Sequence, residues 1–516
     1  MTHLEHCSSN SAKKAPDTKP PLSPGVTRLP LAVPAVVSVE MWERFSFYGM
    51  QSILAYYLYG QLADGGIGLE RGEATALVGS YGAFLYLCTF VGGWIGDHVL
   101  GPERTLLTGA GALMAGHLAL STSTGLGGAI LGLIPIAVGS GFLKTAAITM
   151  LNAVLRGTGT PEGKVTGVFQ VFYSGINIGG VLGPLLCGWL AARYGFHAGF
   201  VAAAVLMGLG LCGYLALRSR MLSALPNTVL AELNPRLYGD QPPQVTLPKI
   251  MAVCLMTIGV IAVGLLLYTR ILSPGALANG MLTATVLTTI GLFATMLTST
   301  HVSAAERRRV VLFVPLFIAS TLYWFLFGQV SGVLAVYSDL RLDRIVGGFE
   351  IPPSWTQSLN SFWVLILVGP FAALLNRLGD KAPRVTTLMP LGLIIAGLTP
   401  LPLLFYVGQA EASTPFVIFA LAILLLTTGE MLIGPTGMAS TGEYAPAAFR
   451  TRFSALFFLS IAVGSSLAGA VSPLYNPESA TAESWYLGVV AAVPIVVGMT
   501  LWALGRRGYV HPSSSM

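Results

Sequence analysis

Long apolar runs alternate with short polar segments along almost the whole chain. Each run is near 20 residues, the length that an α-helix needs to cross a hydrocarbon core of about 30 Å. We predict twelve main spans, at residues 34–60, 73–99, 105–122, 126–151, 165–191, 196–217, 310–337, 353–377, 385–407, 414–440, 451–473 and 484–505. Two more spans, near 249–271 and 275–298, lie between the sixth and the seventh. The pattern therefore predicts an all-α polytopic membrane protein with fourteen transmembrane helices.

Composition agrees with this reading. Hydrophobic residues make up 54% of the chain, charged residues only 10%, and the mean hydropathy is +0.72. A soluble domain carries about 25% charged residues. The first thirty residues lack an apolar run, so we expect a disordered tail and no cleavable signal peptide.

The net charge of +6 follows from how the basic residues are distributed. With the N-terminus in the cytoplasm, 21 of the 28 Lys and Arg residues fall on the cytoplasmic side. Five fall on the outer side: Arg71, Arg193, Arg270, Arg341 and Arg344. Basic residues concentrate in cytoplasmic loops of membrane proteins. We therefore expect both termini in the cytoplasm, contact with the lipid bilayer, and no nucleic-acid partner.

The two halves of the chain carry similar short loops. "GGWIGDHVLGPERT" (92–105) and "LLNRLGDKAPRVT" (374–386) follow the second helix of each six-helix half. The first resembles the loop signature of the major facilitator superfamily. The predicted divisions are a tail (1–30), an N-terminal half (31–218), a linker with two extra helices (219–309), a C-terminal half (310–507) and a tail (508–516).

Enzyme chemistry has little support in the sequence. None of the seven histidines forms an HExxH or similar arrangement, and the five cysteines are scattered without metal-ligand spacing. A membrane enzyme would need a nucleophile with a base, or a metal cluster. We predict no enzyme activity, no metal site and no cofactor.

Five ionisable residues lie at predicted membrane depth: Glu40, Glu43, Arg44, Lys144 and Glu430. The first three stand at i, i+3 and i+4 and share one helix face. Charged groups at this depth are costly and commonly mark ion or substrate paths. Three carboxylates face two cations, so one carboxylate lacks a partner and can carry a proton. The alternatives are a fixed ion pair that holds helix register, and a lysine that extends to the membrane surface.

These residues stand in motifs that resemble those of the proton-dependent oligopeptide transporters, the peptide branch of the major facilitator superfamily. "EMWERFSFYG" (40–49) resembles the helix 1 signature ExxERFxYYG, and "FYSGINIGG" (172–180) resembles the helix 5 signature FYxxINxGS. "GFLKTA" (141–146), "QSLNSFW" (357–363) and "GEMLIGPTGM" (429–438) are similar to the helix 4, 8 and 10 motifs. Two extra helices between the halves are typical of the bacterial members.

The resemblance implies a proton-coupled symporter that imports di- and tripeptides by alternating access. It implies that Glu40, Glu43 and Arg44 couple protons together with Lys144. Lys144 would also attract the peptide carboxylate, and Glu430 would pair with the peptide amino group. The other expected substrate-binding residues are Tyr48, Gln51, Tyr86, Asn177, Gln329 and Asn360. For Tyr48 and Tyr86 the alternative is ordinary packing, and for the two asparagines it is hydrogen bonding between helices.

The chain departs from the family's motifs at several positions. Phe47 replaces a tyrosine, Gln51 an arginine and Gly328 the helix 7 glutamate expected to pair with Lys144. Ser361 replaces a proline and Phe457 a tryptophan. One anion and one cation are lost together, so we expect a working transporter with altered coupling or narrower selectivity.

Two other functions remain open on the same fold: an uncoupled facilitator, and a carrier of another small anion such as nitrate or a modified peptide. We expect a monomer in a bacterial inner membrane.

Overall fold

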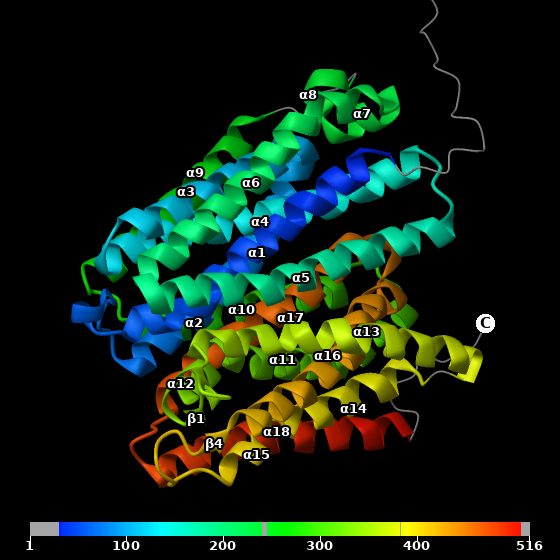
Figure 1. Cartoon of the computed structure of the whole chain (residues 1–516). Helices are drawn as coiled ribbons and strands as arrows, with labels where there is room; N and C mark the ends of the chain where they lie inside the picture. The colour runs from blue at the N-terminus through cyan, green and yellow to red at the C-terminus, as the bar shows by residue number, and fades with distance from the viewer. Residues whose placement is uncertain (1–29, 240–244, 382, 507–516) are drawn as a thin grey trace, which may run out of the picture.

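The computed structural model describes residues 30–239, 245–381 and 383–506 (Figure 1). The predicted C-terminal tail, and the N-terminal tail apart from Pro30, lie outside these residues. The N-terminal half contains α1 (Ala32–Tyr59), α2 (Arg71–Ile95), α3 (Pro102–Thr122), α4 (Gly125–Gly157), α5 (Glu162–Tyr194) and α6 (Phe196–Ser223). The C-terminal half contains α11 (Ala304–Ser331), α13 (Ser358–Leu378), α14 (Val385–Gly397), α16 (Phe416–Tyr444), α17 (Arg450–Val471) and α18 (Ala480–Arg506).

Shorter elements connect these helices. Between the halves lie α7 (Asn227–Leu233), α8 (Pro235–Tyr238), α9 (Leu247–Tyr268) and α10 (Pro274–Thr298). Within the C-terminal half, α12 (Val333–Leu340) follows α11 and α15 (Leu401–Leu404) follows α14. Four two-residue strands form two small sheets: β1 (Leu342–Asp343) is parallel to β4 (Thr414–Pro415), and β2 (Ile345–Val346) is antiparallel to β3 (Phe349–Glu350). One-turn helices occupy Leu62–Asp64, Gly96–Leu100, Pro353–Gln357 (η3), Gly379–Lys381, Ala447–Phe449 and Ser472–Leu474.

The predicted fourteen-helix architecture is confirmed for the described residues. Twelve of the helical segments are long and apolar enough to cross a membrane. The other two long helices are α1, which carries the three charged residues at its centre, and α3, which begins with Glu103 and Arg104. Each half forms its own hydrophobic core, and the halves lie one above the other in Figure 1.

The linker is more structured than its polar composition suggests. Helix α6 continues to Ser223, and α7 packs on the end of the N-terminal half. Val229 of α7 lies against Gly157 of α4. The carboxylate of Glu103, which is fully buried, accepts two hydrogen bonds from Arg218, at 2.7 and 2.9 Å, and one from Asn234. We call this end of the bundle the linker end, and the opposite end, which holds α12 and the strands, the strand end (Figure 1).

The extra hairpin of α9 and α10 lies along the side of the bundle. Gly264 of α9 contacts Ile130 and Ile134 of α4. The hydroxyl of Thr285 in α10 lies 3.0 Å from that of Ser466 in α17, so α10 is tied to the C-terminal half. Most of the hairpin's apolar side chains remain exposed on the protein surface, which suits a lipid-facing element.

The two halves meet mainly where α5 crosses α13 and where α2 crosses α17. Gly79 of α2 and Gly469 of α17 approach so closely that neither position has room for a Cβ atom. Small residues allow membrane helices to pack at such short separations. Among the described residues, the hydrogen bonds and ion pairs that join the halves all lie toward the strand end. The strand end is therefore closed in this structure.

Candidate functional site

Three charged side chains of α1 form a buried cluster in the N-terminal half. Glu40, Glu43 and Arg44 are at most 3% exposed. The Nη2 of Arg44 donates to Glu43 Oε1 at 2.9 Å, and its Nε is ion-paired with Glu43 and lies 3.4 Å from Glu40 Oε1. The spacing predicted that these residues share a face, and the structure brings all three together.

Helix α4 completes this cluster with a residue that the sequence analysis missed. Ser140 donates to Glu43 Oε1 at 2.7 Å and accepts from Arg44 Nη2 at 3.1 Å. Ser140 lies four residues before Lys144 and therefore on the same face of α4. That spacing is the signal that could have identified it.

Lys144 lies beside the cluster but is not part of its hydrogen-bond network. Its ammonium nitrogen lies 5.0 Å from the centre of the Tyr86 ring, a cation–π arrangement. No carboxylate oxygen of a described residue lies within 4.0 Å of that nitrogen. The Lys144 ammonium is therefore held against an aromatic ring and is not ion-paired with a carboxylate of a described residue.

The C-terminal half contributes a carboxylate of its own. Glu430 of α16 accepts a hydrogen bond from Asn360 of α13 at 2.9 Å, and the same amide donates to Thr427 at 3.1 Å. These bonds fix the orientation of the carboxylate. Glu430 belongs to the C-terminal half, whereas Lys144 belongs to the N-terminal half.

The remaining predicted residues differ in their placement. Asn177 is buried and donates to the carbonyl oxygen of Tyr173 in its own helix at 2.9 Å. Gln51 bridges the halves: its amide donates to Ser331 of α11 at 3.1 Å. Gln329 lies apart from this group, inside the C-terminal half, where it accepts a hydrogen bond from Tyr486 of α18 at 2.8 Å.

The departures from the family's motifs are accommodated by packing. The Phe47 ring lies under the Arg44 guanidinium at 5.1 Å and stacks on Tyr81. Gly328 faces α17, where a Cβ atom would lie only 2.8 Å from the Cβ of Ala468. Phe457 packs edge-on against Trp324, with the ring centres 6.3 Å apart. The expected helix 7 partner of Lys144 is thus replaced by close helix packing.

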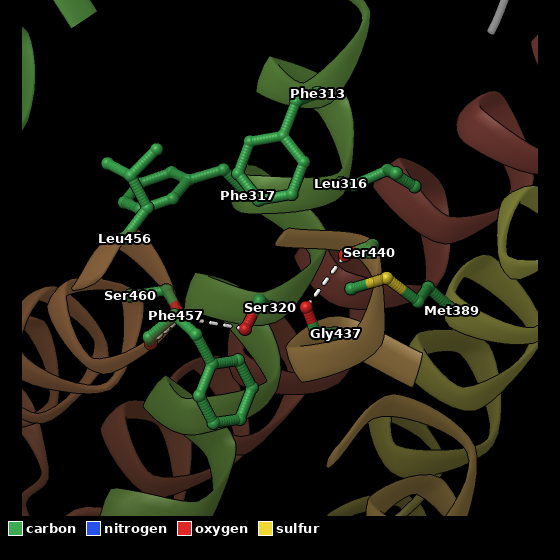
Figure 2. A pocket seen from close by; sticks show the side chains of 10 residues that line it. All are labelled: Phe313, Leu316, Phe317, Ser320, Met389, Gly437, Ser440, Leu456, Phe457 and Ser460. Atoms are coloured by element: carbon green, nitrogen blue, oxygen red, sulfur yellow. Dashed lines mark hydrogen bonds between the residues drawn. The ribbon is translucent and has the colours of Figure 1, made fainter. Parts of the chain in front are cut away.

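A small cavity inside the C-terminal half is separate from this site. Figure 2 shows it between α11, α14, α16 and α17, lined mostly by apolar side chains such as Phe313, Phe317 and Met389. The hydroxyls of Ser320 and Ser460 bond to each other at 2.7 Å. The cavity therefore offers no unpaired charge to a polar ligand.

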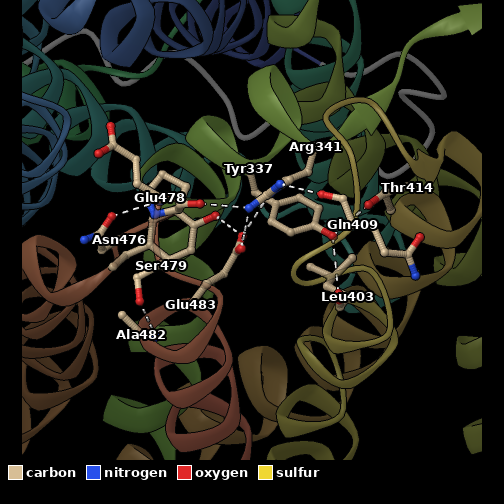
Figure 3. Close-up of polar contacts among 12 residues, drawn as sticks. Tyr337, Arg341, Leu403, Gln409, Thr414, Asn476, Glu478, Ser479, Ala482 and Glu483 are labelled. Atoms are coloured by element: carbon tan, nitrogen blue, oxygen red, sulfur yellow. Dashed lines mark hydrogen bonds and ion pairs between the residues drawn. The ribbon is translucent and has the colours of Figure 1, made fainter.

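A second buried ion pair stabilises the strand end of the C-terminal half. Figure 3 shows Arg341 bonded to Glu483 at 2.8 Å and to the backbone oxygens of Gln409 and Pro477 at 3.1 and 2.8 Å. The hydroxyl of Tyr475 also donates to Glu483, at 2.8 Å. Burial, and then the charge of Glu483, raise the pKa of Tyr475 well above its usual range. This network joins the ends of α12, α15 and α18 into one unit.

The described residues contain no group of three or more His, Cys, Asp and Glu side chains that could hold a metal ion. Two oppositely charged side chains among the predicted site residues, Lys144 and Glu430, belong to different halves.

Known proteins resemble the chain over most of its length. The sequence profile of the POT family matches residues 103–228 and 236–487. The transporter YclF of Bacillus subtilis (strain 168) is 33% identical over 466 residues, 90% of this chain and 91% of that protein. The di-/tripeptide transporter of Lactococcus lactis subsp. cremoris is 31% identical over 490 residues, 92% of this chain and 94% of that protein.

Solved structures agree with the sequence comparison. A crystal structure of the peptide transporter POT in complex with sulfate has a TM-score of 0.83 and 31% identity, covering 95% of this chain and 97% of that one. A POT family transporter in complex with 5-aminolevulinic acid has a TM-score of 0.82 and 26% identity, covering 94% and 98%.

Proposed function

The chain belongs to the POT family of transporters, and from this premise we propose that it imports di- and tripeptides together with protons. The observation that carries the proposal is the pair of opposite charges on the two halves. A small peptide is a zwitterion, so Lys144 would bind its carboxylate and Glu430 its amino group. Tyr48, Tyr86, Asn177 and Asn360 would line the space between them.

The α1 cluster would couple transport to protons. One buried oxygen of Glu40 has no hydrogen-bond partner among the described residues, which suits this carboxylate to carrying the coupled proton. A proton on Glu40 or Glu43 would weaken the hold on Arg44. Lys144 would then exchange between these carboxylates and the peptide carboxylate. Gln51 would hold the two halves together at the closed strand end through its hydrogen bond to Ser331. Gln329 would stabilise the C-terminal half through its hydrogen bond with Tyr486.

The closed strand end supports an inward-facing conformation. The distribution of Lys and Arg along the sequence supports a cytoplasmic location for the linker end. We expect both termini on that side, a bacterial inner membrane as the location, and a monomer as the working unit. Access would alternate by rocking of the two halves about the central site.

An uncoupled facilitator is the second candidate function, because Gly328 removes the helix 7 partner of Lys144. A carrier of another small anion would need only the Lys144 half of the site. Competition by dipeptides separates the anion carrier from the peptide transporter.

Uptake of a labelled dialanine into proteoliposomes, with and without an inward proton gradient, tests the proposal. We expect accumulation only with the gradient, and its loss in Glu43→Gln with exchange of peptide retained. Glu73→Gln, a carboxylate at the far end of α2, is the matched control. Equilibration without accumulation in the wild type would establish a facilitator instead.

Blocked peptides test the two ends of the site separately. Wild-type uptake of dialanine should be inhibited poorly by C-amidated and by N-acetylated dipeptides. Lys144→Gln should lose the discrimination against the amide, and Glu430→Gln the discrimination against the acetyl group. If Lys144→Gln instead lost the discrimination against the acetyl group, and Glu430→Gln that against the amide, the proposed orientation of the peptide would be reversed.

A further inference from the structure

Tyr81 of α2 is a buried residue that the proposed mechanism does not use. Its side chain is 5% exposed, and its hydroxyl makes no hydrogen bond within the described structure. A buried hydroxyl without a partner is unfavourable and calls for a functional or structural reason. Tyr81 stacks on Phe47 of α1, with the ring centres 6.4 Å apart and an interplanar angle of 22°.

Tyr81 is linked to the charged cluster through Phe47: it stacks on the Phe47 ring, and the Arg44 guanidinium lies 5.1 Å from the centre of the same ring. Glu43, Arg44 and Cys88 of α2 also act electrostatically on the Tyr81 hydroxyl. Cys88 contacts Gly141 of α4, which directly follows the Ser140 that binds Glu43.

A matching acceptor lies in the same cluster. Glu43 Oε1 accepts from both Arg44 and Ser140, whereas Glu43 Oε2 accepts no hydrogen bond from the described residues and is held by its ion pair with Arg44. When Arg44 moves away, this oxygen would lose its only partner. A phenol is the right kind of donor to replace it.

We propose that Tyr81 is a positioning residue of the coupling cluster, whose hydroxyl donates to the Glu43 carboxylate when Arg44 releases it. The inference rests on the proposed function of that cluster. It also accounts for Phe47: the hydroxyl that the family's tyrosine would carry at position 47 is provided by Tyr81, on the adjacent stacked ring.

Loss of the Tyr81 hydroxyl should shift the pH dependence of uptake in a defined direction. A hydrogen bond to a carboxylate favours the charged form. Glu40, Arg44 and Lys144 also act on this carboxylate, and a change at Tyr81 leaves all three in place. Without the hydroxyl, the charged form of the cluster would lose one hydrogen bond, so the pH profile of uptake should move upward.

The experiment measures dipeptide uptake against external pH for Tyr81→Phe. We expect the midpoint of the profile to move upward by about 1 pH unit. Phe47→Tyr in the same background should move it back toward the wild-type value, because it restores one hydroxyl to the stacked pair. Tyr57→Phe is the matched control: Tyr57 is also fully buried with an unpaired hydroxyl, but it packs among Phe196 and Phe200.

A second measurement needs no substrate. In an Arg44→Gln background, where Glu43 has already lost its ion pair, the fall in Tm caused by Tyr81→Phe should be larger at neutral than at acidic pH, because the hydroxyl then donates to the charged carboxylate. The difference for Tyr57→Phe should not change with pH. If the wild type accumulates no peptide, the proposed function fails while this comparison still decides the role of Tyr81. A pH-independent Tm difference, or equal shifts in both variants, would overturn the inference.

Discussion

Replacing Gln51 by leucine removes one uncharged contact between the two halves at the strand end. The Gln51 amide donates to Ser331 Oγ at 3.1 Å, and Ser331 donates to Gln357 Oε1 at 3.0 Å. Gln357 in turn donates to the backbone oxygen of Ser52 at 3.4 Å. These three hydrogen bonds link α1 to α11 and to η3.

The loss of stability of the closed strand end in Gln51→Leu can be worked out from the hydrogen bond that is removed. A neutral hydrogen bond contributes a net stabilisation of about 0.5–1.5 kcal/mol. Ser331 keeps its bond to Gln357, so Gln51→Leu leaves no donor of Ser331 unpaired. We therefore expect the closed strand end to be destabilised by about 1 kcal/mol, which is roughly a fivefold change in the equilibrium between closed and open.

The assay follows the labelling rate of a single cysteine at position 354 in a variant that lacks the native cysteines. Ser354 is 4% exposed and lies against Gly188 where η3 meets α5, so a thiol there reacts only when the strand end opens. A membrane-impermeant reagent should label it about fivefold faster in Gln51→Leu. The acceleration should be the same at acidic and neutral pH, because Gln51, Ser331 and Gln357 carry no charge.

Gln61→Leu is the control, since Gln61 is exposed at the same end of the protein. An unchanged rate in Gln51→Leu, or an equal increase in Gln61→Leu, would refute the reasoning. An acceleration that appears at only one pH would mean that a titrating group, and not the uncharged bridge, holds the strand end closed.

Two further predictions concern packing and buried charge. Arg218→Ala removes the cation that pairs with the buried Glu103 carboxylate. Breaking a buried pair costs about 3–5 kcal/mol, and the partial exposure of Arg218 reduces this to about 2 kcal/mol. We expect a lower midpoint of denaturant unfolding. Gly328→Glu should lower Tm, because its Cβ would press on Ala468, and adding Ala468→Gly should recover most of the loss in the same thermal scan.

Much of the architecture could be predicted from the sequence because the membrane imposes a strict pattern. Apolar runs of about 20 residues mark the helices, and ionisable residues within them are rare enough to stand out. The cluster of Glu40, Glu43 and Arg44 was predicted from spacing alone, since it is formed within a single turn of one helix.

Contacts between different helices could not be predicted from the sequence in the same way. Ser140 and Glu43 are 97 residues apart, and Gln51 and Ser331 are 280 apart, so no local period relates them. Gln329 shows the same limit, because its position next to Gly328 does not reveal that its side chain binds Tyr486 within one half. The polar composition of residues 218–248 does not reveal that Val229 and Leu233 of α7 are buried on one face.

The losses at positions 51 and 328 have related physical consequences. Each removes a charge that the family's motif would place between helices, and each position is filled without charge: Gln51 by a hydrogen bond to Ser331, Gly328 by contact with Ala468. Uncharged contacts do not titrate near neutral pH. We therefore infer that these two contacts do not respond to pH near neutrality, and that the proposed proton sensitivity is concentrated in α1 and its neighbours on α2 and α4. A transporter built in this way would keep proton coupling with fewer charged residues. The proposed coupling carboxylates, and Lys144, which would pair with them, all lie within one half.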